Sequence, residues 1–224
     1  MTANNQGAFV LRDCALIAIA TGQRAQNLKE LRDILLGIHS GSLYFHFWGG
    51  LLQARFEERE YNNDFAAWAR HSLHDTVLAE RLSVVDPTEL ADLEALRQEL
   101  INIVEQRLDE HESLTWTAPD QQFEFIRSQI VVFDTRRRVE QPEQLAVLLP
   151  TLSTGSVFYH FIDARRRSAA GLDDFRTWLG GFGTQYAALV ERLAALDPYF
   201  VSLSELRAEL AALFAAYFEV TSHE

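Results

Sequence analysis

The sequence predicts a mainly helical fold: an internally duplicated helical bundle with two pseudo-symmetric halves, with a short strand expected at the start of each half. Two recurring motifs and one periodic pattern support this. Residues 41–47 (GSLYFHF) recur as residues 155–161 (GSVFYHF), and Asp-Phe-x-x-Trp occurs at 64–68 and again at 174–178. Leucines at helical spacing close both halves, so repeated helical units follow.

The two halves are expected at residues 8–112 and 122–222, joined by a polar segment and packed as one compact unit. A chain of 224 residues that is 48% hydrophobic has enough apolar side chains for such a core.

Each half begins with an apolar run, at residues 9–20 and 123–133. Runs this short do not separate a strand from a buried helix by periodicity alone. The isoleucines and valines of the second run favour strand, so a short strand is expected at the start of each half.

The first helix is expected at residues 27–39, because Asn27 can cap free amides while Glu30 follows three residues later. In the second half Pro142 supplies a rigid first-turn residue, and Pro150 ends the helix near Leu149.

The second helix of each half is expected to start at Ser42 and at Ser156, whose hydroxyls can accept amide hydrogen bonds. His46 and His160 then lie just past the first turn. Both histidines are expected to be buried among aromatic neighbours and hydrogen-bonded, since a buried imidazole needs polar partners.

The third helix begins at Asn63 or Asp64 in the first half and at Asp173 or Asp174 in the second. The phenylalanine and tryptophan that follow are three residues apart and should face the core. The leucine-rich last helices are expected at residues 88–108 and 202–220.

Charge and composition disfavour several classes of partner. The formal net charge of −12, with a single lysine and no long basic run, disfavours nucleic acid. The one cysteine cannot form an internal disulfide, which fits a reducing compartment. No charged leader precedes the first apolar run, and charges interrupt every apolar stretch, so neither secretion nor membrane insertion is expected and the cytoplasm is the expected location.

The segments at 41–47, 63–68, 78–82 and 96–100 resemble an uncharacterised bacterial family of unknown function. That family shows Gly-Ser-x-x-Tyr-x-His, then Asn-Asp-Phe-Ala-x-Trp, then Leu-x-Glu-x-Leu, here expected as two tandem copies. The chain departs from it after His46, where the family carries further histidines and this chain has a tryptophan and two glycines. The resemblance implies a fold unit and no activity.

The recurring histidines are the main candidate site. Each can pair with the carboxylate that opens the next helix, His46 with Asp64 and His160 with Asp174, and a carboxylate that fixes the imidazole tautomer suits a metal ligand or a general base. A structural role competes with this, since both aspartates also serve as helix starters. All four remain candidate catalytic residues.

Two further groups occur once. His71 and His74, with Asp75 beside them, would share a helix face as metal ligands can. A solvated helix surface is the favoured explanation, because Gly181 and Thr184 stand at the matching positions of the second half. The arginines at 165–167 could hold a phosphate or carboxylate, and internal ion pairs are the competing use.

The sequence therefore favours a non-enzymatic binding, regulatory or interaction module. The alternative is a metal-assisted or acid–base enzyme with a His/Asp site between the two repeats. No cofactor is predicted, although a metal is possible. The expected partner is a protein or a small molecule rather than nucleic acid or a membrane, and a homo-oligomer is possible.

Overall fold

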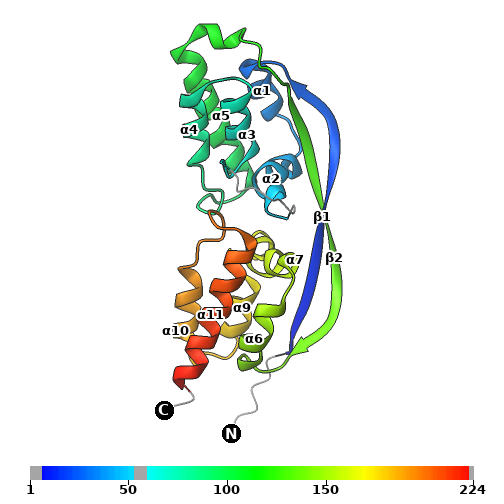
Figure 1. Cartoon of the computed structure of the whole chain (residues 1–224), viewed down its shortest axis with the longest axis vertical. Helices are drawn as coiled ribbons and strands as arrows, with labels where there is room; N and C mark the ends of the chain where they lie inside the picture. Colours follow the sequence, from blue (N-terminus) through cyan, green and yellow to red (C-terminus); the bar gives the residue numbers. More distant parts are fainter. Residues whose placement is uncertain (1–6, 53–59, 222–224) are drawn as a thin grey trace. The chain divides into compact units, whose positions relative to one another are not determined.

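The fold contains two long strands as well as helices, as Figure 1 shows. The computed structural model describes residues 7–52 and 60–221. Strands β1 (Phe9–Ala25) and β2 (Phe123–Val139) pair in a two-stranded antiparallel sheet, and each is 17 residues long. The expectation of a mainly helical, internally duplicated bundle with at most short strands is therefore wrong: the fold combines helices with a sheet.

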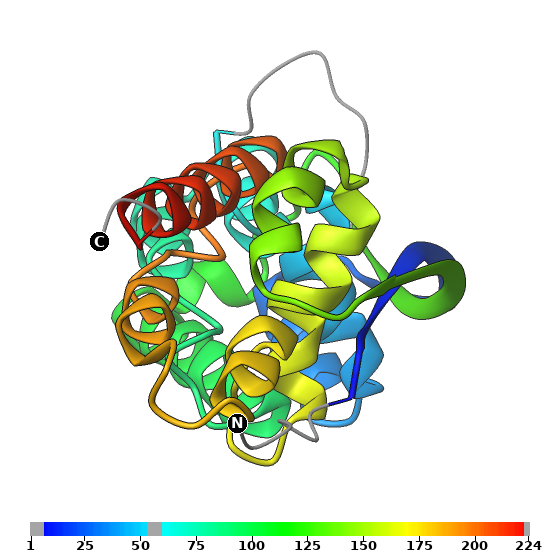
Figure 2. The same cartoon turned by 90° about the horizontal axis from the view of Figure 1, so that it is seen from below.

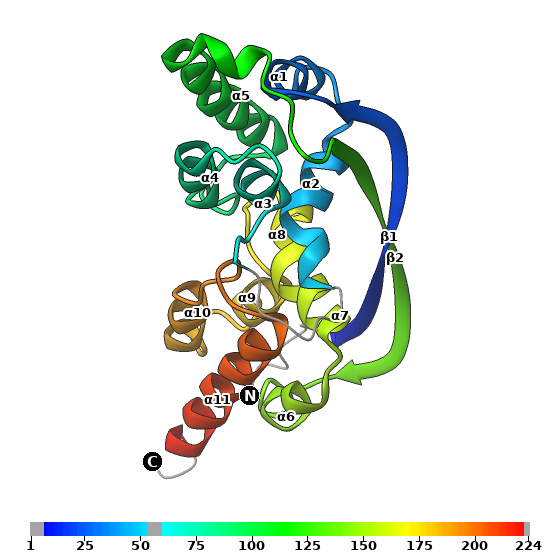
Figure 3. The same ribbon diagram turned by 45° about the horizontal axis from the view of Figure 1, so that its top comes forward.

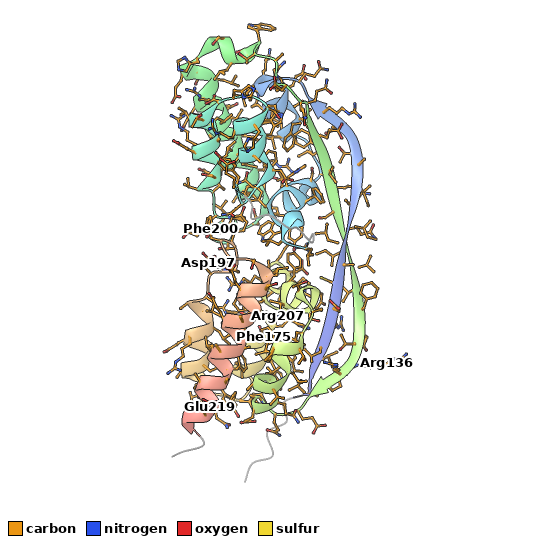
Figure 4. All side chains as sticks on the ribbon, viewed as in Figure 1. Arg136, Phe175, Asp197, Phe200, Arg207 and Glu219 are labelled. Atoms are coloured by element: carbon orange, nitrogen blue, oxygen red, sulfur yellow. The ribbon has the colours of Figure 1, made fainter. Side chains whose placement is uncertain are left out.

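Each strand extends beyond the apolar run that predicted it, because the residues at its C-terminal end are polar. Threonine hydroxyls tie these ends across the sheet: Thr21 donates to the carbonyl of Phe125, and Thr135 donates to that of Leu11, both at 2.6 Å. Figure 4 shows the Arg136 side chain, next to the second threonine, projecting away from the helices. Such segments lack the apolar alternation by which a strand is recognised.

The chain folds into two compact units, and the boundary cuts both strands. Unit 1 contains residues 1–15 and 131–224, and unit 2 contains residues 16–130. The first part of β1 therefore packs with the helices that follow β2. The sequence had placed residues 8–15 with the first half.

Unit 2 contains five α-helices in its described part. Asn27 caps α1 by accepting from the amide of Glu30, as its sequence predicts. Helices α3 and α4 lie side by side (Figure 3). The elements are α1 (Leu28–Leu35), α2 (Ser40–Trp48), α3 (Asp64–His71), α4 (Thr76–Ser83) and α5 (Leu93–Glu110), with short 3-10 turns η1 (Gly49–Leu51) and η2 (Glu112–Thr115).

Unit 1 is built around α11, which packs against α6 and α10 (Figures 2 and 3). Arg207 of α11 donates to the carbonyl of Leu152, and Phe175 is fully buried. The elements are α6 (Glu143–Leu148), 3-10 turn η3 (Leu149–Thr151), α7 (Thr154–Val157), π-helical turn η4 (Phe158–Asp163), α8 (Ala164–Arg167), α9 (Asp174–Gly180), α10 (Ala187–Ala194) and α11 (Leu203–Thr221).

The helices that carry the histidines start earlier than expected. His39 caps α2 and Ser153 caps α7, so the prediction of Ser42 and Ser156 as caps is wrong. Ser42 instead donates its hydroxyl to the carbonyl of Ile126 in β2, at 2.8 Å.

In the two described ranges, no helix has both the length and the apolar character needed to span a bilayer.

Candidate functional site

The aspartates beside the histidines are not the residues that cap the third helices. Asn63 caps α3 by accepting from the amide of Ala66, and Asp173 caps α9 by accepting from the amide of Arg176. Of the two candidates at each helix start, Asn63 and Asp173 are therefore confirmed as the caps, whereas Asp64 and Asp174 are the first residues inside their helices. Their carboxylates are left to bind the histidines.

In unit 2, His46 joins helix α3 to strand β2. Its Nδ1 lies 2.9 Å from Oδ2 of Asp64, and its Nε2 accepts the backbone N–H of Ile126 at 3.2 Å. The ring is 3% exposed and contacts Phe65 and Phe123.

In unit 1, His160 makes the same set of contacts with a different strand. Its Nδ1 lies 2.7 Å from Oδ2 of Asp174, and its Nε2 accepts the backbone N–H of Arg12 in β1 at 2.9 Å. The ring is 3% exposed and contacts Phe9 and Phe175. We call each such arrangement of strand amide, imidazole and aspartate a histidine clamp.

The contacts determine the tautomer of both rings. A backbone amide can only donate, so Nε2 of His46 and of His160 must present its lone pair. In the neutral ring the proton is then on Nδ1 and is donated to the aspartate. Each histidine therefore uses both nitrogens inside the protein, as the expectation of buried and hydrogen-bonded histidines requires.

Arg167 extends the clamp of unit 1. Its Nη2 donates to Oδ2 of Asp174 at 3.1 Å and to the carbonyl of Tyr159 at 2.9 Å, and its Nε donates to buried Asp163. Burial raises the pKa of Asp174, but the hydrogen bond from His160 and the charge of Arg167 outweigh burial, so the pKa lies below its usual value. The carboxylate therefore stays ionised at neutral pH.

A pocket of about 380 Å³ opens beside this clamp, entirely within unit 1. We call it the unit 1 pocket. Its size falls within the usual range of small-molecule sites. Charged, polar and aromatic side chains of β1, η4, α8 and α9 line it, among them Phe9, Arg12, Tyr159, His160, Arg167, Asp174, Thr177 and Trp178.

The proposed metal ligands His71, His74 and Asp75 have separate partners. His71 contacts Glu60, His74 contacts Asp120, and Asp75 accepts from Arg107. Across the described residues, no three histidine, cysteine, aspartate or glutamate side chains gather as a metal site would require.

The arginines at 165–167 are drawn into internal contacts. Arg166 and Arg167 both bind Asp163, and Arg165 lies over the ring of Phe161 at 4.8 Å. Of the three, Arg167 lines the unit 1 pocket.

Sequence reasoning paired each histidine with its aspartate but missed the strand amides and Arg12. One signal was present. Arg12 and Asp13 interrupt the apolar run at 9–20, where a buried strand would continue with apolar residues. The strand amide of each clamp leaves no signal in the sequence, because nearly every residue has a main-chain amide.

Comparisons with known proteins agree with this fold. The solved structure described as "The structure of OrfY from Thermoproteus tenax" matches with a TM-score of 0.81 and 24% sequence identity, covering 94% of this chain and 95% of that chain. This likeness shows the fold alone. No curated protein matches the chain.

A family of unknown function, DUF5752, matches residues 6–215 as a single copy. The expectation of two tandem copies of a family unit is therefore corrected: one family domain contains both histidine clamps. Because the match covers nearly the whole sequence, the chain belongs to the family of unknown function DUF5752.

Proposed function

We propose that this protein is a non-enzymatic binding module that holds a small molecule in the unit 1 pocket. The observation that carries the proposal is the use of both ring nitrogens of His160 at the wall of that pocket. A histidine held in this way fixes the shape of a site without exchanging protons with a ligand.

The enzymatic alternative requires a free imidazole nitrogen. A general base must accept a proton, and a metal ligand must offer a lone pair, yet Nε2 of His160 already accepts the Arg12 amide. Releasing it would leave a backbone donor unsatisfied, which costs about 1–3 kcal/mol when the donor is buried. His46 is committed in the same way to Ile126, so binding is favoured over catalysis at both clamps.

The clamp does suit a binding role. It joins β1 to α9 through a buried ring, and both elements supply walls of the pocket. Rigid walls reduce the ordering cost of binding, so a pre-formed pocket holds a ligand more tightly than one that must be assembled.

The test of this function blocks the unit 1 pocket with a larger side chain. A panel of small metabolites is screened by thermal shift against the wild-type protein and a Thr177→Trp variant, since Thr177 is an exposed residue of the pocket wall. Thr151→Trp is the matched control: it is exposed, belongs to unit 1, and its hydroxyl donates to a preceding backbone carbonyl as that of Thr177 does.

The proposal predicts at least one compound that stabilises the wild type and Thr151→Trp but not Thr177→Trp. Compounds that stabilise all three proteins equally, or none that stabilises the wild type, would contradict it.

A further inference from the structure

The two clamps are chemically alike, but the strand residues that complete them are not. Arg12 donates its amide to His160, whereas Ile126 donates its amide to His46. The apolar side chain of Ile126 serves the clamp as well as an arginine does. The guanidinium of Arg12 is therefore not needed to hold the strand.

That guanidinium also forms no ion pair with any residue that the structure describes. After the larger effects of Arg138 and the Arg136 amide, the charge of Arg12 helps to lower the pKa of Asp134. Asp134 nevertheless binds Arg138 through both carboxylate oxygens and accepts the amide of Arg136. Arg12 is exposed and lines the unit 1 pocket.

The other charges of the pocket are largely offset. Asp174 accepts from both His160 and Arg167 through one oxygen, and Arg167 is balanced by Asp163 and Asp174. Of the lining side chains, Arg12 and Arg167 are cationic and Asp174 is anionic, so the wall has an excess of positive charge in a chain whose formal net charge is −12.

From this we propose that the ligand of the unit 1 pocket carries an oxyanion, a phosphate or a carboxylate, and that Arg12 binds it. The inference rests on the proposed binding function and names the chemical class of its ligand. A guanidinium presents donors in a fork that fits both oxyanions, and hydrogen bonds to charged groups are stronger than neutral ones. Arg167 lines the same wall, but its charge is offset by Asp163 and Asp174, so Arg12 supplies the charge available to the ligand.

The experiment titrates inorganic phosphate and, separately, succinate into the full-length protein by calorimetry, at an ionic strength held constant with sodium chloride. The two anions distinguish a phosphate ligand from a carboxylate ligand. Arg12→Ala is the test variant, because its backbone amide still completes the clamp. Arg137→Ala is the matched control, since this exposed arginine of β2 in unit 1 is not among the residues of the pocket wall and its loss changes the net charge equally. Thermal unfolding verifies that both variants fold.

We expect one of the two anions to bind the wild type and Arg137→Ala with similar affinity, and Arg12→Ala at least about tenfold more weakly, the factor that a lost charge-assisted hydrogen bond implies. Arg12→Lys should recover part of this loss.

Three results would overturn the inference: no binding of either anion by the wild type, equal weakening in Arg12→Ala and Arg137→Ala, or no weakening in either. A different result would separate the two proposals: a neutral compound that binds Arg12→Ala but not Thr177→Trp. The pocket would then bind a ligand that is not an anion, so the proposed function would hold and the present inference would fail. Failure of the pocket-filling test would instead remove the binding function itself.

Discussion

A backbone amide of a strand that packs against helices needs a hydrogen-bond acceptor, and the buried imidazoles provide one. His160 supplies one to Arg12, and Asp174 in turn satisfies the remaining ring nitrogen. Every polar atom of the ring is thereby paired, as burial requires.

Replacing His160 by Gln should lower the free energy of unfolding by about 1–3 kcal/mol, because the Arg12 amide and Asp174 lose their shared partner. Urea unfolding measures this. His74→Gln is the control: His74 is 65% exposed and binds Asp120 at the surface, so a change within about 0.5 kcal/mol is expected. Equal effects of the two substitutions would mean that the clamp does not stabilise the fold.

Acid should weaken the clamp of unit 1 through Asp174. The pKa of this carboxyl is lower in the folded protein than its usual value, so ionised Asp174 stabilises the fold above the unfolded pKa of about 4. That stability is lost as the pH falls through the folded pKa.

The wild type should accordingly exceed Asp174→Asn in unfolding free energy at pH 7, and the difference should shrink below about pH 4. Urea unfolding at a series of pH values measures it. A difference that stays constant down to pH 3 would show that the ionised carboxylate is not what stabilises the clamp.

At the scale of elements, helix α7 approaches β1 so closely that only glycine fits at position 155. A Cβ added there would overlap Oδ1 of Asp13 and the carbonyl oxygen of Cys14. The Cys14 thiol, whose pKa burial raises to about 12, donates to the carbonyl of the same glycine.

Gly155→Ala should therefore destabilise the protein by about 1–3 kcal/mol, since the contact involves backbone that cannot move aside. Gly180→Ala is the control, because a Cβ there has no neighbour within 4 Å, and it should be neutral or stabilising by up to about 1 kcal/mol. Thermal melting of both variants compares them. Equal melting temperatures would place α7 farther from β1.

The presence of the helices was more predictable than their boundaries, because caps and leucine spacing are local signals that competing residues nearby can also supply. Asn27 predicted the start of α1, and the recurring motifs predicted the pairing of each histidine with its aspartate. The caps at His39 and Ser153 were missed since serines closer to the motif offered an equally good local signal. The polar ends of β1 and β2 were missed because pairing between distant strands leaves no local pattern.

At the scale of the whole molecule, unit 1 takes a strand segment from a distant part of the chain, whereas unit 2 is one continuous stretch. Phe9 and Leu11 of β1 are buried in the unit formed by residues 131–224, and Trp178 of that unit donates to the carbonyl of Gly7. A repeat in sequence therefore does not mark out a segment that folds by itself.

A fragment of residues 116–224 should unfold without cooperativity, because it lacks Phe9, Leu11 and the Arg12 amide. Adding a synthetic peptide of residues 7–18 should restore a cooperative transition, whereas the same peptide with Phe9 and Leu11 replaced by Ser should not. Circular dichroism measures both. A fragment that melts cooperatively without any peptide would contradict this description of unit 1.

The central claim is that His46 and His160 each bind a strand amide through Nε2, and the proton positions on their rings test it most directly. Nitrogen-15 NMR of the folded protein at neutral pH should show, for both rings, an unprotonated Nε2 and a proton on Nδ1, because each Nε2 accepts a backbone amide. A proton on Nε2 of either ring would mean that the amide is not bound there and would contradict the account.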